Sequence, residues 1–411
     1  MAKKRNEIVV EEENSRRSRP QGEETPKRSG KGKKRKKRKS PVQKVLRVLV
    51  ILLIVFILYA AGMLTYLSAT EYKPEDIENV AVEGEAKPNE ITGRTTVSAG
   101  DTVNVMSWNI GYGALGDNAD FFLDGGKSVK SSDEARVREN LEEISKSIET
   151  VHPNVVFLQE VDRKSARSYE IDEASTIKSY LNEKAGLNYL STFATNYKVN
   201  FIPYPIPPIG KVDAGIMTLS DYEVSSSTRM QLPCPFSWPM RLINLKRCLM
   251  VDRVPVVDES GNPTGKELVL VNLHLEAYDS GEGKAEQTKM LKDFLQQEVD
   301  KGNYVIAGGD FNQKFSTVDS RIYPEYDGSW HCGDIDVSEF GDDFEFIMDN
   351  STPSCRYLDM VYEGADKMTF QYYLIDGFIV SKNMDVNYYF TIGQDFKNSD
   401  HNPVVLSVNL K

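Results

Sequence analysis

Residues 304–313 read YVIAGGDFNQ, an apolar run that ends abruptly in polar side chains. A short, nearly continuous apolar run of this kind is typical of a strand covered on both faces. Asp310 and Asn312 follow it directly, and the two glycines before them let the backbone approach a neighbour closely. A buried polar group without a partner costs about 1 to 3 kcal/mol. We therefore expect Asp310 and Asn312 to belong to a polar site at the end of a strand.

The same pattern occurs in five other segments along the chain. These segments are MSWNIG, VVFLQEVDR, VNLHLE, YLIDGF and NSDHNPV. Their polar residues are Asn109, Glu160, His274, Asp376, Asp400 and His401. Each is expected to stand where an apolar strand ends, and repetition of this pattern predicts that the six segments build one polar site.

Together the six segments resemble the endonuclease/exonuclease/phosphatase superfamily, which includes deoxyribonucleases, abasic-site endonucleases, neutral sphingomyelinases and inositol polyphosphate phosphatases. Any single motif is weak, but six in the family's order form a strong signal. The resemblance covers about residues 101–411. It implies an α/β fold, a four-layer sandwich of two face-to-face mixed β-sheets flanked by helices, with the site at the strand ends.

The pattern between these segments is compatible with that fold, because strand-like runs alternate with helical ones. Asp133 is a plausible N-cap for a helix that places four apolar residues on one face: Val137, Leu141, Ile144 and Ile148. A second helix has the same periodicity, with Met290, Leu291, Phe294, Leu295 and Val299. The sequence thus predicts at least two helices that pack on sheets.

The resemblance implies a metal site formed by Asn109, Glu160 and Asp400. Amide and carboxylate oxygens suit Mg²⁺ or Mn²⁺, which we expect as the cofactor. Some relatives place an acidic residue two positions after the Asn, where this chain has Gly111, so the ligand set is lean. The alternatives are a strand-end salt bridge for Glu160 and a turn-capping role for Asn109.

The resemblance also implies catalytic roles for five residues. Asp310 orients or deprotonates the attacking water, while Asn312 and His274 donate to the phosphate. Asp376 holds the imidazole of His401 in one tautomer and keeps it basic or cationic. Arg163 is a candidate phosphate contact, with a surface ion pair as the alternative.

An uncharged run of twenty residues from Val48 to Leu67 is long enough to cross a membrane. A core helix of this length would have a polar face, and a cleaved signal peptide has a shorter apolar run. The basic run KGKKRKKRK at 31–39 places the N-terminus in the cytoplasm, so the remainder is exported. We expect four parts: a disordered basic tail (1–44), a transmembrane helix (45–68), a stalk or loosely packed lead-in (69–98) and the catalytic domain (99–411).

Charge disfavours duplex nucleic acid as the substrate. Residues 1–47 contain 18 Lys and Arg against 6 Asp and Glu, a net charge of +12, whereas residues 48–411 contain 32 against 55, a net charge of −23. A strongly acidic domain repels a polyanion unless it has a local basic groove. The expected partners are a phosphate-ester substrate and the membrane, next to whose anionic lipids the basic tail would lie, and we expect a monomer.

The function expected from these features is that of a membrane-anchored extracellular phosphoesterase on a bacterial cell surface, acting on a lipid, sugar or nucleotide ester. The alternatives are a secreted-type DNA endonuclease and a non-catalytic phosphate-binding module. Three loops are candidates for setting the substrate: 111–128, 201–211 and 233–241. Export permits disulfides, and the sequence-local pairing joins Cys234 with Cys248 and Cys332 with Cys355, although free thiols remain open.

Overall fold

The computed structural model describes residues 40–88, 95–130, 132–279, 281–324 and 326–411. It divides into two compact units, residues 1–59 and 60–411. Residues 1–39 of the predicted disordered tail (1–44) therefore lie outside the described residues. In the part of the chain that is described, helix α1 (Pro41–Ala69) is long and apolar enough to cross a membrane, and its most apolar window has no buried residue.

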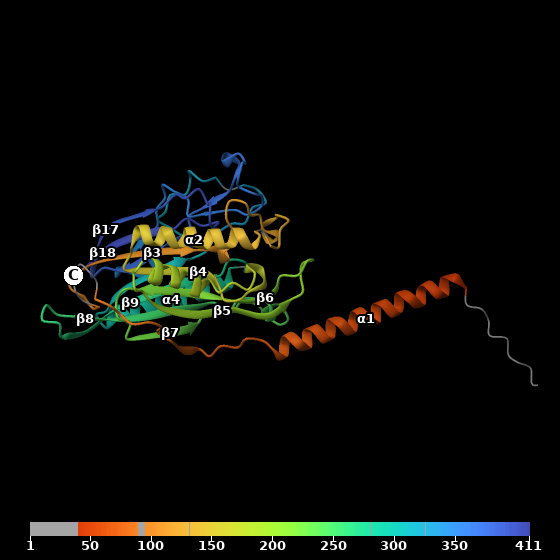
Figure 1. The fold of residues 1–411 in the computed structure, drawn as a ribbon, viewed down its shortest axis with the longest axis horizontal. Coiled ribbons are helices and arrows are strands. Elements are labelled where there is room, and N and C mark those ends of the chain that lie inside the picture. Colours follow the sequence, from red (N-terminus) through yellow and green to blue (C-terminus); the bar gives the residue numbers. More distant parts are fainter. Residues whose placement is uncertain (1–39, 89–94, 131, 280, 325) are drawn as a thin grey trace, which may run out of the picture. The chain divides into compact units, whose positions relative to one another are not determined.

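Two mixed sheets form the centre of the second unit (Figure 1). The larger sheet has the order β1 (Ile77–Val80), β7 (Ser226–Gln231), β8 (Cys248–Val257), β9 (Pro263–His274), β10 (Tyr304–Asp310), β16 (Asp376–Ser381) and β13 (Phe344–Ile347), with β2 (Val97–Ser98) paired to β8. The smaller sheet has the order β17 (Met384–Thr391), β18 (Val404–Leu410), β3 (Thr102–Asn109), β4 (Val155–Asp162), β6 (Gly210–Ser220) and β5 (Leu190–Ile202).

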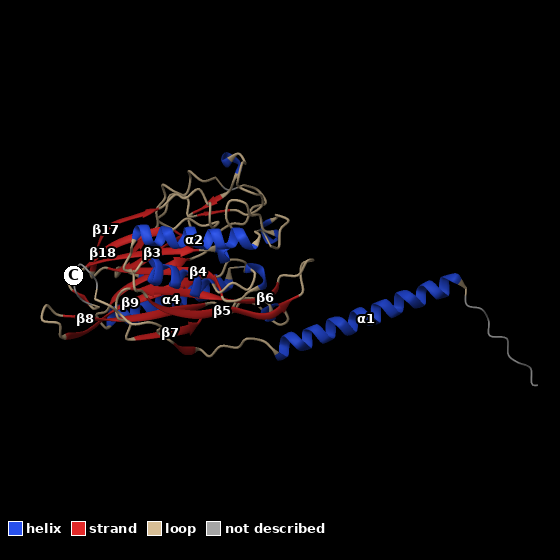
Figure 2. Cartoon of the chain, viewed as in Figure 1, coloured by secondary structure: helices blue, strands red, loops and turns tan. Residues whose placement is uncertain are grey.

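The two sheets pack face to face through one apolar cluster, and helices cover their outer faces (Figure 2). The interior cluster includes Val105 and Phe157 from the smaller sheet and Leu270 and Ile306 from the larger one. Helices α2 (Glu134–Val151) and α3 (Glu173–Ser179) cover the smaller sheet, and α4 (Glu282–Asp300) covers the larger one. The predicted α/β sandwich of two mixed sheets flanked by helices is confirmed.

Short elements complete the domain. Two small ladders join β11 (Gln313–Phe315) to β12 (Gly333–Ile335) and β14 (Cys355–Arg356) to β15 (Tyr372–Tyr373). Single helical turns occur at η1 (Gly111–Gly113), η2 (Phe122–Asp124), η3 (Ala166–Ser168), η4 (Tyr180–Lys184), η5 (Met240–Leu242), η6 (Val337–Phe340) and η7 (Lys367–Thr369). The first two lie in the loop after β3, which was expected to influence the choice of substrate.

The two predicted helices form as expected. The side chain of Asp133 accepts a hydrogen bond from the backbone N–H of Arg136 and caps α2. The four apolar residues predicted on one face of α2 are all buried. In α4, Leu291, Phe294 and Leu295 are buried and the other two predicted residues are partly buried.

Part of residues 69–98, predicted as a stalk or a loosely packed lead-in, pairs with strands of the larger sheet. Strand β1 pairs with β7, and β2 pairs with β8. Between them, the backbones of Glu83 and Ser191 exchange two hydrogen bonds. These short strands have no apolar run of their own, and the strands that pair with them lie far along the chain. Local composition therefore did not predict them.

Strand direction explains how six segments reach one place and corrects one expectation. β3 and β4 are parallel, as are β9 and β10, so Asn109, His274 and Asp310 are terminal residues of their strands. β16 runs antiparallel to β10 and places Asp376 directly opposite Asp310. Asp376 therefore begins its strand, and the Asp400 segment precedes β18 in the same way. When two neighbouring strands are antiparallel, the first residue of one lies opposite the last residue of the other. The polar residue of such a strand therefore stands at its start.

Neither sequence-local disulfide forms among the described residues. Cys248 and Cys355 are buried as thiols, and Cys234 is exposed. Burial raises the pKa of the Cys248 thiol to about 11, so this side chain behaves as a small apolar group of the core.

Candidate active site

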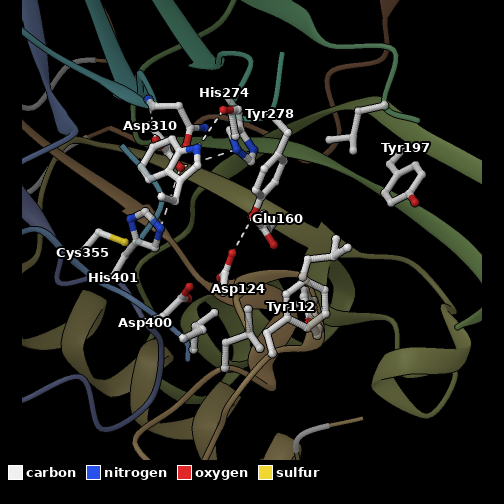
Figure 3. A pocket seen from close by; sticks show the side chains of 18 of the residues that line it. Tyr112, Asp124, Glu160, Tyr197, His274, Tyr278, Asp310, Cys355, Asp400 and His401 are labelled. Carbon is white, nitrogen blue, oxygen red and sulfur yellow. Dashed lines mark hydrogen bonds and ion pairs between the residues drawn. The ribbon is translucent and has the colours of Figure 1, made fainter. Parts of the chain in front are cut away.

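A pocket of about 210 Å³ opens where the polar ends of the two sheets meet (Figure 3). Six of the eight predicted site residues line it: Glu160, His274, Asp310, Asn312, Asp400 and His401. The other two, Asn109 and Asp376, lie directly behind this lining and hydrogen-bond to it. The structure therefore brings together every residue that the six segments nominated.

His401 is held by Asp376. Its Nδ1 lies 2.8 Å from Asp376 Oδ2, and its carbonyl oxygen accepts a hydrogen bond of 2.8 Å from Trp108 Nε1. Burial lowers the pKa of His401, but the negative charge of Asp376 and hydrogen bonds to Asp376 and Cys355 outweigh that effect. Since the pKa ends well above its ordinary value, His401 is cationic at neutral pH, with Nε2 directed toward Asp310 at 3.8 Å.

His274 faces the same carboxylate as a neutral imidazole. Its Nε2 lies 3.4 Å from Asp310 Oδ2. Burial, followed by the positive charges of Arg247, His401 and Arg167, lowers the pKa of His274 well below its ordinary value. Two imidazoles thus flank Asp310, one cationic and one neutral.

Asp310 is suited to proton transfer near neutral pH. Burial and the negative charge of Asp376 raise its pKa to about 7, against the lowering effects of His401 and of its hydrogen bond from Asn109. A general base is most effective when its pKa is close to the working pH. The Oδ1 atom of Asp310 accepts a hydrogen bond of 2.8 Å from the backbone N–H of Asn312, so this carboxylate is also fixed in orientation.

The amide of Asn109 connects the two sheets. Its Nδ2 donates to Glu160 Oε1 at 3.2 Å and to Asp310 Oδ2 at 3.0 Å, and its Oδ1 accepts from the backbone N–H of Gly111 at 3.0 Å. Glu160 occupies a bulge in β4 with φ of +53°. A positive φ is unfavourable for a glutamate, and such strain persists where the surroundings require a side chain to point in one direction. Here that direction is into the pocket.

Three carboxylates gather on one side of the pocket: those of Glu160, Asp400 and Asp124 (Figure 3). Burial raises the pKa of Asp400 to about 6, with Glu160 adding to the rise. Burial and the charge of Asp400 raise the pKa of Asp124 to about 7. Carboxylate oxygens are the donors that a hard divalent cation such as Mg²⁺ accepts, although among the described residues these three do not form a group whose ligand atoms all lie within 4.8 Å of one another.

Asp124 is a site residue that the sequence motifs missed. It belongs to η2, in the loop already expected to matter, and its Oδ1 accepts a hydrogen bond of 3.2 Å from Tyr278 Oη. A Cβ at Gly111 would lie 2.7 Å from Asp400 Oδ1, so no acidic side chain fits at that position. Asp124, thirteen residues further along the chain, supplies a carboxylate that lines the same pocket as Asp400.

Three arginines also line the pocket, two of them buried and Arg167 partly buried, and none was predicted from sequence. Arg167 makes a two-pronged ion pair with Asp162 and stacks on Tyr112. Arg247 pairs with Glu276. The third, Arg356, donates to backbone carbonyls.

Arg163, which sequence did suggest as a phosphate contact, is absent from the pocket lining described. Its guanidinium stacks over the ring of Phe193 at 3.8 Å. Because side chains alternate between the faces of a strand, a local motif cannot decide which of two nearby arginines reaches the site.

Comparison with known proteins shows a family match. A model of the Endonuclease/Exonuclease/phosphatase family matches residues 106–387. A solved endonuclease/exonuclease/phosphatase from Beutenbergia cavernae is 19% identical, with 75% of this chain and 72% of that chain covered, at a TM-score of 0.49. Truncated TDP2 from Caenorhabditis elegans is 16% identical, with 76% and 98% covered, at a TM-score of 0.43. A family protein from Leptotrichia buccalis is 13% identical, with 75% and 100% covered, at a TM-score of 0.46. No curated protein matches the sequence.

Proposed function

This chain belongs to the endonuclease/exonuclease/phosphatase family, and from that premise we propose that it hydrolyses a phosphate ester with a divalent metal ion, Mg²⁺ or Mn²⁺, while anchored in the membrane by α1. The observation that supports the proposal most strongly is the position of Asp310. Its carboxylate lies within 4 Å of both histidines and is hydrogen-bonded to Asn109. A pseudo-enzyme that only bound phosphate would not require this complete set of acid, amide and histidine groups.

Each residue has a role that follows from its charge and place. Asp310, with a pKa of about 7, accepts a proton from the attacking water. Cationic His401 stabilises negative charge on the phosphoryl oxygens, and neutral His274 donates one hydrogen bond to them. Asp376 positions His401 and does not itself touch the substrate.

The side-chain amide of Asn312, which the resemblance assigns to the phosphate, already makes one hydrogen bond to the backbone. Its Nδ2 donates to the carbonyl oxygen of Leu275 at 2.9 Å, and its backbone has φ of +51°. The residue lines the pocket, so the second hydrogen of this amide is the one assigned to the phosphate.

Asn109, Glu160 and Asp400 are the proposed metal ligands, and Asp124 adds a fourth oxygen donor to that side of the pocket. A divalent cation bound there would neutralise charge on the phosphoryl oxygens in the transition state. Because Gly111 offers no ligand, the carboxylate of Asp124 from the loop after β3 is the proposed additional oxygen donor.

The test of the proposed function is a panel assay. The purified full chain in detergent with Mg²⁺ is given a bis-aryl phosphate, duplex DNA, sphingomyelin and phosphatidylinositol phosphates. We expect turnover of at least one ester other than DNA. If no phosphate ester is cleaved by folded protein that binds Mg²⁺, the non-catalytic binding module becomes the better description.

Duplex DNA is expected to be a poor substrate at 0.15 M salt. Residues 48–411 carry a net charge of −23, and the arginines at the pocket are already paired with acidic side chains or backbone carbonyls. A polyanion therefore meets net electrostatic repulsion from the domain. Plasmid nicking measures this directly, and rapid nicking at that salt concentration would favour the endonuclease instead.

We further propose that the N-terminus is cytoplasmic and that the domain is exported, because the basic run at 31–39 precedes the span. Protease added to intact cells is expected to digest the domain and leave the tail intact. Replacing all seven basic residues from Lys33 to Lys39 by neutral ones is expected to reduce the fraction of chains with a cytoplasmic N-terminus. Protection of the domain together with cleavage of the tail in the unaltered chain would reverse this assignment.

A further inference from the structure

The last turns of α1 pack onto the catalytic unit. Leu67 is buried, and Met63 and Leu64 are partly buried, in a cluster of residues from β5, β6 and η5. The buried members of the cluster from these elements are Val199, Ile202, Val212, Ala214 and Leu242. All of these residues belong to the unit 60–411.

This packing places neighbouring loops beside the end of α1. Leu67 ends the predicted span, and the first charged residue after it is Glu71, so Leu67 lies near the outer edge of a spanning helix. Leu64 and Met63 lie about 4.5 to 6 Å deeper, at 1.5 Å per residue. The loops beside this cluster, 203–209 and 233–241, therefore lie next to the outer end of α1.

Those two loops expose large apolar side chains. Ile206 is 94% exposed, and Tyr204, Trp238 and Met240 are each more than half exposed. The indole Nε1 of Trp238 donates to Ser68 Oγ at 3.1 Å, which ties the exposed ring to the end of the span. Exposed aromatic and apolar side chains next to the end of a membrane helix are typical of the interfacial belt of membrane proteins.

The same apolar rim continues into the pocket. Tyr197, Ile209 and Ala214 belong to the cluster around Leu67 and also line the pocket that contains Asp310. On the adjoining side, the ring of Tyr204 contacts that of Phe122 in an edge-to-face arrangement, with centroids 6.1 Å apart. Phe122 is followed by Leu123, which is exposed and lines the pocket. The cluster at the end of the span and the lining of the pocket thus share apolar residues, and Tyr204 connects the exposed loop 203–209 to the pocket through Phe122 and Leu123.

We propose that the substrate is a phosphate ester that carries a long apolar chain and lies in the outer leaflet beside α1. Its phosphate enters the pocket while the apolar chain stays against the rim formed by Tyr204, Ile206, Trp238 and Met240. This inference rests on the proposed function, and it narrows the substrate to a membrane lipid or a lipid-linked phosphate. A water-soluble ester would make no use of a pocket whose wall is continuous with the end of the span.

The first experiment locates the rim and does not depend on catalysis. The full chain is reconstituted in phosphatidylcholine vesicles with bromine on the acyl chains or without it. Trp238 fluorescence, obtained as the difference between the unaltered chain and Trp238→Phe, is expected to be quenched severalfold by the brominated lipid. Equal fluorescence in both vesicles would overturn the proposed position of the rim.

The second experiment tests the choice of substrate. Vesicles that contain phosphatidylglycerol, sphingomyelin, phosphatidylinositol phosphate or an isoprenoid phosphate are compared with the deacylated or short-chain soluble counterparts. We expect one vesicle lipid to be cleaved at least about tenfold faster than its soluble counterpart. Ile206→Ser with Met240→Ser is expected to lower that ratio at least fivefold. Ile322→Ser with Met368→Ser, at two exposed apolar positions outside the rim, serves as the matched control and is expected to leave the ratio unchanged.

The outcomes separate this inference from the function on which it rests. Cleavage of soluble esters alone, with no vesicle lipid cleaved, refutes the lipid substrate and leaves a phosphoesterase. No cleavage of any ester refutes the proposed function, and the quenching result still reports where the rim lies. Equal loss of the ratio in the rim variant and in the control variant would also refute the role of the rim.

Discussion

His401→Ala is expected to lower kcat by about 10² to 10⁴-fold while KM changes much less, the range usual for a positioned acid–base or charged group. The imidazole lies 2.8 Å from Asp376 and 3.8 Å from Asp310, and it is cationic because Asp376 raises its pKa against the effect of burial. Its charge acts mainly on the phosphoryl oxygens of the transition state, where negative charge is greatest. Steady-state kinetics on the best ester from the panel measure both constants.

The partner of His401 provides a second readout. Asp376→Asn removes the negative charge that raises the pKa of His401, so this pKa should fall. Because the cationic form is the active one, activity is lost as pH rises through that pKa, and the basic limb of the kcat profile should move to lower pH. The double variant should be little worse than the worse single variant, since the two residues act as a unit.

A matched control guards against a general effect of removing histidine. His152 is exposed at the end of α2 in a left-handed conformation that asparagine tolerates. His152→Asn is therefore expected to keep kcat within about twofold of the unaltered enzyme. Circular dichroism must first show that each variant is folded. A folded His401→Ala enzyme with nearly unchanged kcat would show that this family mechanism does not operate here.

Removal of divalent metal is expected to abolish turnover, and added Mg²⁺ or Mn²⁺ should restore it. Glu160→Gln keeps the shape of the side chain but removes the charge of the proposed ligand. The Mg²⁺ concentration for half-maximal activity should then rise about 10- to 100-fold, since even hydrogen-bond partners of metal ligands contribute that much to affinity. Isothermal titration calorimetry with Mg²⁺ alone gives the same comparison without a substrate.

The control for this variant is Glu286→Gln on the exposed face of α4, which makes the same chemical change away from the pocket. It should bind Mg²⁺ as the unaltered chain does. Asp124→Asn is the informative intermediate case, because Asp124 faces the same side of the pocket from a loop. Full turnover in the presence of excess EDTA would exclude the metal-dependent mechanism.

Much of this protein was determined by local sequence. The apolar runs identified most of the long strands, periodic apolar residues identified α2 and α4, and polar residues at strand ends identified all eight members of the predicted site. These features depend on neighbours a few residues away, since a buried strand is apolar and a polar residue at its end requires a partner. The roles assigned to those eight residues remain predictions that the variants above test.

Other features were decided only by the tertiary structure. Strand direction made Asp376 the first residue of β16, and the bend of the loop after β3 brought Asp124 to the carboxylates. Pairing with distant strands turned parts of the expected stalk into β1 and β2. The contact of Leu67 with the wall of the pocket arises in the same way. Each feature depends on which distant segments become neighbours, and that is settled when the whole chain buries its apolar surface, because no local pattern of residues encodes it.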